Sequence, residues 1–211
     1  MRTPGSRDDC RVRMARPGSG GFGVLAEHGV DVARGDCARL LAGRERGGTA
    51  GGTDDGGGIL VGNGAQLALL RCTFRDNVAA DAGGAIRNQG TLIVEDSAFD
   101  HNVAANAGGA ISSSSSTSVL IAGSFFAENE AHGQFSGGGA IDSPDKITIV
   151  DSSCVNNRAK TLGGAITHFD DVAGQSSISQ SCFVGNAAGF TGNAIDVFAG
   201  SQPLGAAGLW W

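Results

Sequence analysis

A tetrapeptide that recurs at nearly constant spacing constrains this chain more than any other feature. It reads GGGI at 56–59, GGAI at 83–86, 108–111, 138–141 and 163–166, and GNAI at 192–195. The successive spacings are 27, 25, 30, 25 and 29 residues. A repeat of this length predicts a solenoid, because each repeat forms one unit that must stack on its neighbours to bury its apolar side.

A second motif falls once in each repeat and ends in asparagine. It reads FRDN at 74–77, FDHN at 99–102, FAEN at 126–129, CVNN at 154–157 and FVGN at 183–186. A segment of alternating apolar residues stands just before each copy. Two motifs in a fixed order indicate that the internal geometry of every repeat is the same.

Each repeat is expected to form one coil. The glycine pair permits positive φ and close approach of neighbouring coils, and Ile86 and its equivalents begin the first strand. Leu92 and Val94 lie on one face of a second strand, since side chains alternate with period two, and Phe99 fills the third. The sequence predicts an all-β fold, a right-handed parallel β-helix (solenoid) of about six coils with three short strands per coil.

Leucine-rich repeats are the main competing architecture, because they also stack asparagines at a similar period. Their pattern requires leucines where this chain has Ser97 and Ala104, and it does not predict the GGAI motif. The left-handed hexapeptide β-helix requires regular six-residue units, which this chain lacks.

The asparagine that ends the second motif is expected to form a ladder. Coils stack at ~4.8 Å, so identical amide side chains can hydrogen-bond from coil to coil, and asparagine tolerates the left-handed backbone of turns. The structural ladder comprises Asn77, Asn102, Asn129, Asn157 and Asn186.

The residue before that asparagine gives the one candidate site for a metal ion. On successive coils it is Asp76, His101 and Glu128, which places an imidazole between two carboxylates. Such a set can hold zinc, manganese or a similar ion, or move a proton. The alternative is a solvated turn with ordinary surface pairing. No cofactor and no catalytic residue are expected elsewhere.

Four segments are expected along the chain. Residues 1–19 are a disordered or mis-started N-terminus, 20–55 a degenerate N-terminal coil or cap, 56–200 the β-helix repeats and 201–211 a C-terminal tail. The formal net charge of −6 argues against nucleic acid as a partner. No apolar run approaches the ~18 residues of a membrane-spanning helix.

The alternating GGA[ILV] and FxxN motifs over residues 56–195 resemble the repeats of chlamydial polymorphic outer membrane proteins. The resemblance implies a β-helical passenger segment of the autotransporter type, carried on a cell surface or in the outer membrane, or secreted. The sequence departs from the pattern of that family in three ways. Cys154 stands where the other repeats have phenylalanine. The start of the chain does not read as a secretory signal, and no C-terminal membrane barrel is expected.

The expected function is therefore that of a non-enzymatic, adhesin-like surface. Its partner would be an extracellular carbohydrate or a protein on a host or neighbouring cell.

Two alternatives remain open. β-Helices also carry polysaccharide-active enzymes, so the chain could be a fragment of a pectate lyase-like or uronan epimerase-like protein. Its candidate acids would be the adjacent pair Asp170 and Asp171, or Asp96 and Asp151, which share a column with Gly123 between them. The chain could also be a degraded gene segment with no role of its own.

Overall fold

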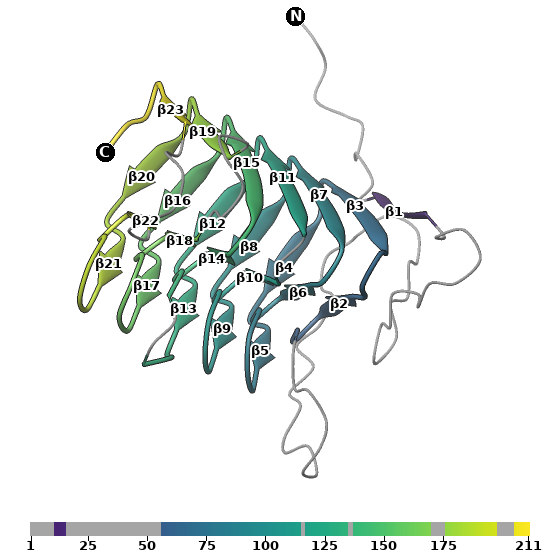
Figure 1. Cartoon of the computed structure of the whole chain (residues 1–211), viewed down its shortest axis with the longest axis horizontal. Helices are drawn as coiled ribbons and strands as arrows, with labels where there is room; N and C mark the ends of the chain where they lie inside the picture. Colours follow the sequence, from purple (N-terminus) through teal and green to yellow (C-terminus); the bar gives the residue numbers. More distant parts are fainter. Residues whose placement is uncertain (1–10, 16–55, 115–116, 135–136, 170–175, 198–204) are drawn as a thin grey trace, which may run out of the picture.

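A computed structural model describes residues 11–15, 56–114, 117–134, 137–169, 176–197 and 205–211. From residue 56 onward, the described residues form a stack of parallel strands (Figure 1), with five complete coils and part of a sixth. All of its named elements are strands, and the described residues hold no helix that could cross a membrane. The prediction of an all-β solenoid is confirmed.

Four sheets run along the stack, and each complete coil gives one strand to each of them. The first sheet contains β2 (Ile59–Val61), β6 (Ile86–Asn88), β10 (Ile111–Ser113), β14 (Ile141–Ser143), β18 (Ile166–His168) and β22 (Ile195–Val197). The second contains β1 (Arg11–Ala15), β3 (Gln66–Leu70), β7 (Thr91–Glu95), β11 (Ser118–Ala122), β15 (Lys146–Val150), β19 (Ser177–Ser179) and β23 (Gly205–Ala207).

The third sheet contains β4 (Thr73–Arg75), β8 (Ala98–Asp100), β12 (Phe125–Ala127), β16 (Ser153–Val155) and β20 (Cys182–Val184). The fourth contains β5 (Val78–Ala79), β9 (Val103–Ala104), β13 (Glu130–Ala131), β17 (Arg158–Ala159) and β21 (Ala187–Ala188). A complete coil thus has four strands, where three were predicted. The fourth strand was missed because its two residues are too few to show an alternating pattern.

The core is built from columns of identical side chains. Ile86, Ile111, Ile141 and Ile166 are all 0% exposed and stand in register on the first sheet. On the third sheet the rings of Phe74 and Phe99 stack at 4.8 Å between centroids, and those of Phe99 and Phe126 at 4.7 Å. Cys154 continues the phenylalanine column and is buried.

The two glycines of each GGAI motif are required for different reasons. Gly108, the first of its pair, has φ +62°, a left-handed conformation that favours glycine. A Cβ on Gly109, the second, would lie 2.1 Å from the carbonyl oxygen of Gly139 in the next coil. The first glycine therefore makes the turn, and the second lets adjacent coils approach.

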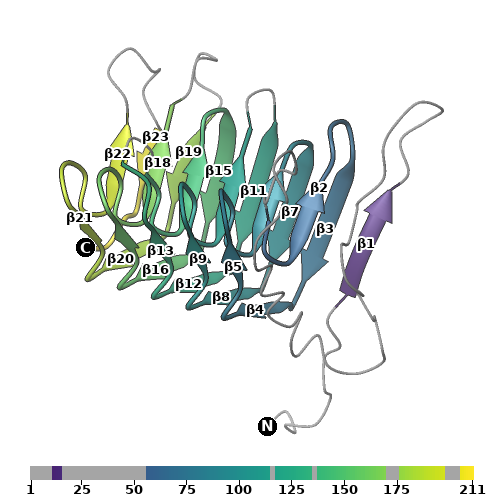
Figure 2. The same ribbon diagram turned by 90° about the horizontal axis from the view of Figure 1, so that it is seen from below.

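Both ends of the chain contribute strands to the second sheet. Within residues 1–19, β1 pairs antiparallel with β3 at the outer edge of the first coil (Figure 2). At the other end, β23 pairs with β19, and the Phe183 backbone N–H donates to the Trp210 carbonyl over 2.7 Å. The predicted degenerate coil at 20–55 lies outside the described residues. Of the predicted C-terminal tail at 201–211, residues 205–211 are described, and their strand β23 continues the second sheet.

Candidate functional site

The asparagine column forms a continuous hydrogen-bonded ladder through the five complete coils. Each asparagine donates its side-chain amide to Oδ1 of the next one, over 2.7, 2.9, 2.8 and 2.9 Å along the stack. The backbone N–H of each donates to the same oxygen. The ladder consists of Asn77, Asn102, Asn129, Asn157 and Asn186, of which the first four are 0% exposed. Apart from Oδ1 of Asn77 in the first coil, which has no partner among the described residues, the side-chain groups of the ladder bond to the protein itself, so the ladder is structural.

The left-handed turn lies one residue before each ladder asparagine. Asp76, His101, Glu128 and Asn156 have φ of 57°, 53°, 51° and 54°, whereas no ladder asparagine has positive φ. The interpretation that asparagine itself supplies the left-handed residue is therefore wrong. Its amide must instead lie inside the coil to reach its neighbours, so the conformational cost falls on the preceding residue.

The three candidate metal ligands stand in this outward-facing column, but only two of them touch. His101 Nε2 lies 2.8 Å from a Glu128 carboxylate oxygen in the next coil. His101 Nδ1 lies 2.7 Å from Asp100, its own neighbour in sequence, and not against Asp76. Both ring nitrogens therefore face carboxylates already. In the part of the chain that the structure describes, no group of three His, Cys, Asp or Glu side chains is arranged to hold a metal ion.

The His101 contacts belong to a chain of charges across three coils. Arg75 pairs with Asp100, Asp100 with His101, and His101 with Glu128. The hydrogen bond that the His101 ring donates to Asp100 raises the pKa of His101, the charges of Asp100, Glu128 and Asp76 add to the effect, and slight burial opposes it. The His101 and Glu128 side chains are each about half exposed, so water weakens the pairing.

The acidic residues that would serve a polysaccharide-active enzyme do not belong to this chain of charges. Asp96 and Asp151 are exposed and have left-handed backbone conformations, with φ of 47° and 48°. Gly123 lies between them in the column. A Cβ on Gly123 would lie 2.5 Å from Oδ1 of Asp96, so that carboxylate occupies the space above the glycine. Asp170 and Asp171 lie outside the described residues.

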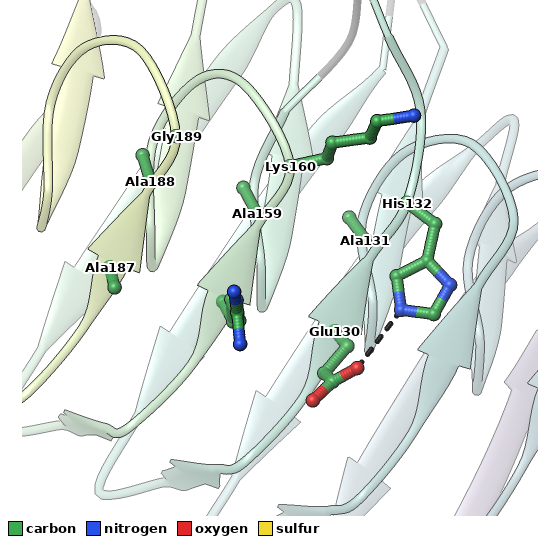
Figure 3. Close-up of a pocket in the computed structure, with 9 residues that line it drawn as sticks. Glu130, Ala131, His132, Ala159, Lys160, Ala187, Ala188 and Gly189 are labelled. Atoms are coloured by element: carbon green, nitrogen blue, oxygen red, sulfur yellow. Dashed lines mark hydrogen bonds and ion pairs between the residues drawn. The ribbon is translucent and has the colours of Figure 1, made fainter.

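A shallow hollow over the fourth sheet is a site that the sequence reasoning missed. It crosses three coils (Figure 3) and has a volume of about 670 Å³. Buried alanines lie between its outward-facing side chains on the first two coils, and only small residues line it on the last coil. The lining residues are Glu130, Ala131, His132, Arg158, Ala159, Lys160, Ala187, Ala188 and Gly189. No sequence signal pointed to it, because it depends on the unpredicted two-residue strands.

The charge in this hollow is positive. Glu130 already contacts His132, with 2.9 Å between the carboxylate oxygen and Nε2 (Figure 3). The next coil carries Arg158 on β17 and Lys160 just beyond it. Neither cation makes an ion pair with any described residue. An anionic group entering the hollow would therefore meet two cations that are not already neutralised.

Comparison with known proteins agrees with the repeat architecture. A family model described as the Chlamydia polymorphic membrane protein repeat matches residues 71–89 and 96–114. Each match contains one FxxN motif and the GGAI motif that follows it. No curated protein and no solved structure gives a significant match. Two consecutive repeats of the solenoid thus match the Chlamydia polymorphic membrane protein repeat.

Proposed function

We propose that this chain is a non-enzymatic, adhesin-like segment that is carried on a cell surface or secreted, and that it binds an acidic extracellular carbohydrate. The repeat family and the β-solenoid fold agree with a surface adhesin-like role. The inward positions are filled by isoleucine, phenylalanine and the asparagine ladder, so a ligand must bind to outward-facing side chains.

The observation that carries the choice of ligand is the pair of cations in the hollow on the fourth sheet. Arg158 and Lys160 lie on one coil and line the same hollow, which crosses three coils. A linear acidic polysaccharide repeats its anionic groups along its length and can follow the stacked coils. Shallow contacts repeated over several coils suit the extended surface of a solenoid.

The charge requirement can be tested on a column of immobilised heparin, used as the acidic polysaccharide. The full chain should be retained and should elute with salt, because exposed charge pairs are screened by added ions. The Arg158→Ala/Lys160→Ala double variant should elute at clearly lower salt. Lys146→Ala is the matched control, because it removes the only other lysine and lies on β15 of the second sheet. Equal elution of the double variant and the parent would contradict the proposed ligand.

Surface display is tested separately on the cells that make the protein. An antibody raised against the purified chain should label intact, unpermeabilised cells or the culture medium. Labelling that requires permeabilised cells would refute surface display, whatever the heparin result. Turnover of pectin or alginate by the purified chain would refute the non-enzymatic assignment and favour the polysaccharide-active alternative.

A further inference from the structure

A second hollow lies over the first sheet, on a different face from the cationic one. The residue after the GGAI isoleucine points outward and forms a column in which Arg87, Ser112, Asp142 and Thr167 are in register. The first three line a hollow of about 370 Å³, together with residues of the loops that precede β6 and follow β10. This volume lies near the lower end of the range for small-ligand sites.

Two side-chain oxygen atoms in this column have no hydrogen-bond partner among the described residues. Oδ1 of Asp142 and Oγ1 of Thr167 are buried, and neither has a hydrogen-bond partner among the described residues. A buried oxygen without a partner is uncommon in folded proteins, because it loses its bonds to water and gains none. Of the two, Asp142 lines the hollow, so a ligand placed there could complete its hydrogen bonding.

The ionisation of Asp142 also differs from that of an ordinary structural carboxylate. Burial raises the pKa of Asp142 to about 7, and the positive charge of Arg87 opposes the rise. Near neutral pH the carboxyl group therefore exists in both its protonated and its ionised form, and it can donate or accept a hydrogen bond. A strongly perturbed carboxyl group lining a hollow is a recognised mark of a functional site.

The other lining groups mix donors and acceptors. Arg87 donates from Nη1 to the Ser112 hydroxyl over 2.6 Å, which holds the guanidinium over the strand. On the rim, the Asn106 amide donates to Asp81 over 3.1 Å. Ser114 adds a hydroxyl group from the loop after β10. None of the described residues that line the hollow has a large apolar side chain, which argues against a lipid or an aromatic ligand.

We propose that this hollow binds an uncharged saccharide, whose hydroxyl groups contact Asp142 and Arg87. An anionic ligand would face the carboxyl groups of Asp81 and Asp142, and a cationic ligand would face Arg87. A neutral sugar has neighbouring hydroxyl groups that both donate and accept, which matches the mixed lining. This site goes beyond the proposed binding of acidic polysaccharide, because it lies on another sheet and takes another class of ligand.

Saturation-transfer NMR on the full chain tests the proposal. The probes are the methyl glycosides of glucose, galactose, mannose and N-acetylglucosamine, with glucuronate as the charged comparison. At least one neutral glycoside should show transfer and saturable binding, and glucuronate should bind more weakly. Asp142→Asn and Arg87→Gln should each weaken that binding about tenfold, as expected for the loss of a charged hydrogen-bonding partner.

Matched controls separate this site from its surroundings. Asp196→Asn changes the same column on β22, outside the hollow, and should bind like the parent. Lys160→Ala should reduce retention on heparin and should not change the binding of the neutral glycoside, so the two proposals can fail independently. If Asp142→Asn or Arg87→Gln does not fold, Ser114→Ala on the rim provides the same test. Transfer to none of the four glycosides, preference for glucuronate, or unchanged binding in the folded variants would overturn the proposal.

Discussion

The side-chain amide of Asn102 donates to Oδ1 of Asn129 over 2.9 Å, and the Asn102 backbone N–H donates to the same oxygen over 3.0 Å. The Asn129 amide in turn donates to the Phe99 carbonyl over 3.0 Å and to Oδ1 of Asn157 over 2.8 Å. One buried amide side chain therefore joins three successive coils.

Replacement of Asn129 by alanine should lower the free energy of unfolding by about 3 kcal/mol or more. The substitution removes the acceptor of the Asn102 backbone N–H and side-chain amide and a donor to the Phe99 carbonyl. Each buried polar group left unsatisfied costs roughly 1–3 kcal/mol. Urea denaturation measures the loss. Asn156→Gly is the matched control, since Asn156 is exposed and left-handed, and it should change stability by less than about 1 kcal/mol. Similar losses in both variants would show that the ladder contributes little.

Phe99→Ala should lower the free energy of unfolding by roughly 3–5 kcal/mol, the usual range for replacing a buried phenylalanine by alanine. Its ring stacks on Phe74 on one side and on Phe126 on the other. Phe183→Ala should lower the free energy of unfolding by less, because Phe183 lies in the last complete coil. Among the described aromatic side chains, its ring contacts only Trp211, which is tilted against it and largely exposed. Urea melts of the two variants make the comparison. A larger loss at Phe183 would contradict the view that end coils fray more readily than central ones.

Gly109→Ala should be far more damaging than Gly64→Ala. At Gly109 the new Cβ would meet the backbone carbonyl of Gly139 at 2.1 Å, which no rotamer change can relieve. Gly64 has φ +71° but nothing within 4 Å of the Cβ position, so only the left-handed conformation is penalised, at roughly 1–2 kcal/mol. Thermal melts and soluble yield of both variants provide the measurement. A fully stable Gly109→Ala protein would rule out the close approach of adjacent coils.

Stability should fall as the pH rises from about 4 to 7 through the titration of Asp142. The pKa of this carboxyl group is raised from 3.8 to about 7 in the folded chain, so the folded state holds its proton more tightly than the unfolded state does. Its contribution is fully present below the lower value and is lost as the pH rises through the upper one. The change is on the order of 2 kcal/mol, and urea melts at pH 5 and pH 8 measure it. Asp142→Asn should flatten this dependence, and an unchanged profile would refute the assignment.

Protonation of His101 should also favour the folded state, by a smaller amount. Its pKa is raised, so the stabilisation is present below the unfolded pKa of 6.5 and is lost as the pH rises through the folded pKa. Because the pair is half exposed, the effect should stay below about 1 kcal/mol. An NMR titration of the imidazole gives the pKa directly. Asp100→Asn should lower that pKa more than Glu128→Gln does, and the reverse order would contradict the leading role of Asp100.

The columns of the core could be predicted because register in a parallel stack is strict. Once GGAI and FxxN recur in phase, backbone hydrogen bonds between coils place Ile111 beside Ile86 and Phe126 beside Phe99. The column position of Asp76, His101 and Glu128 follows from the same register. Which carboxylates His101 contacts does not, because the direction of an exposed side chain depends on its rotamer and on its neighbours in the next coil.

The sequence by itself determined the solenoid, its period and the residues that stack, since these follow from repeated spacing and the strict alternation of strand side chains. Only the tertiary structure decided that Asp100, rather than Asp76, pairs with His101. It also decided that Arg158 and Lys160 share one hollow and that Asp142 keeps a buried oxygen without a partner in the other. The two hollows depend on how side chains and loops from three coils enclose a space. The burial and the local charge of a group in such a space depend on residues of successive repeats, which are 25 to 30 positions apart in the sequence. A short sequence pattern therefore cannot predict them.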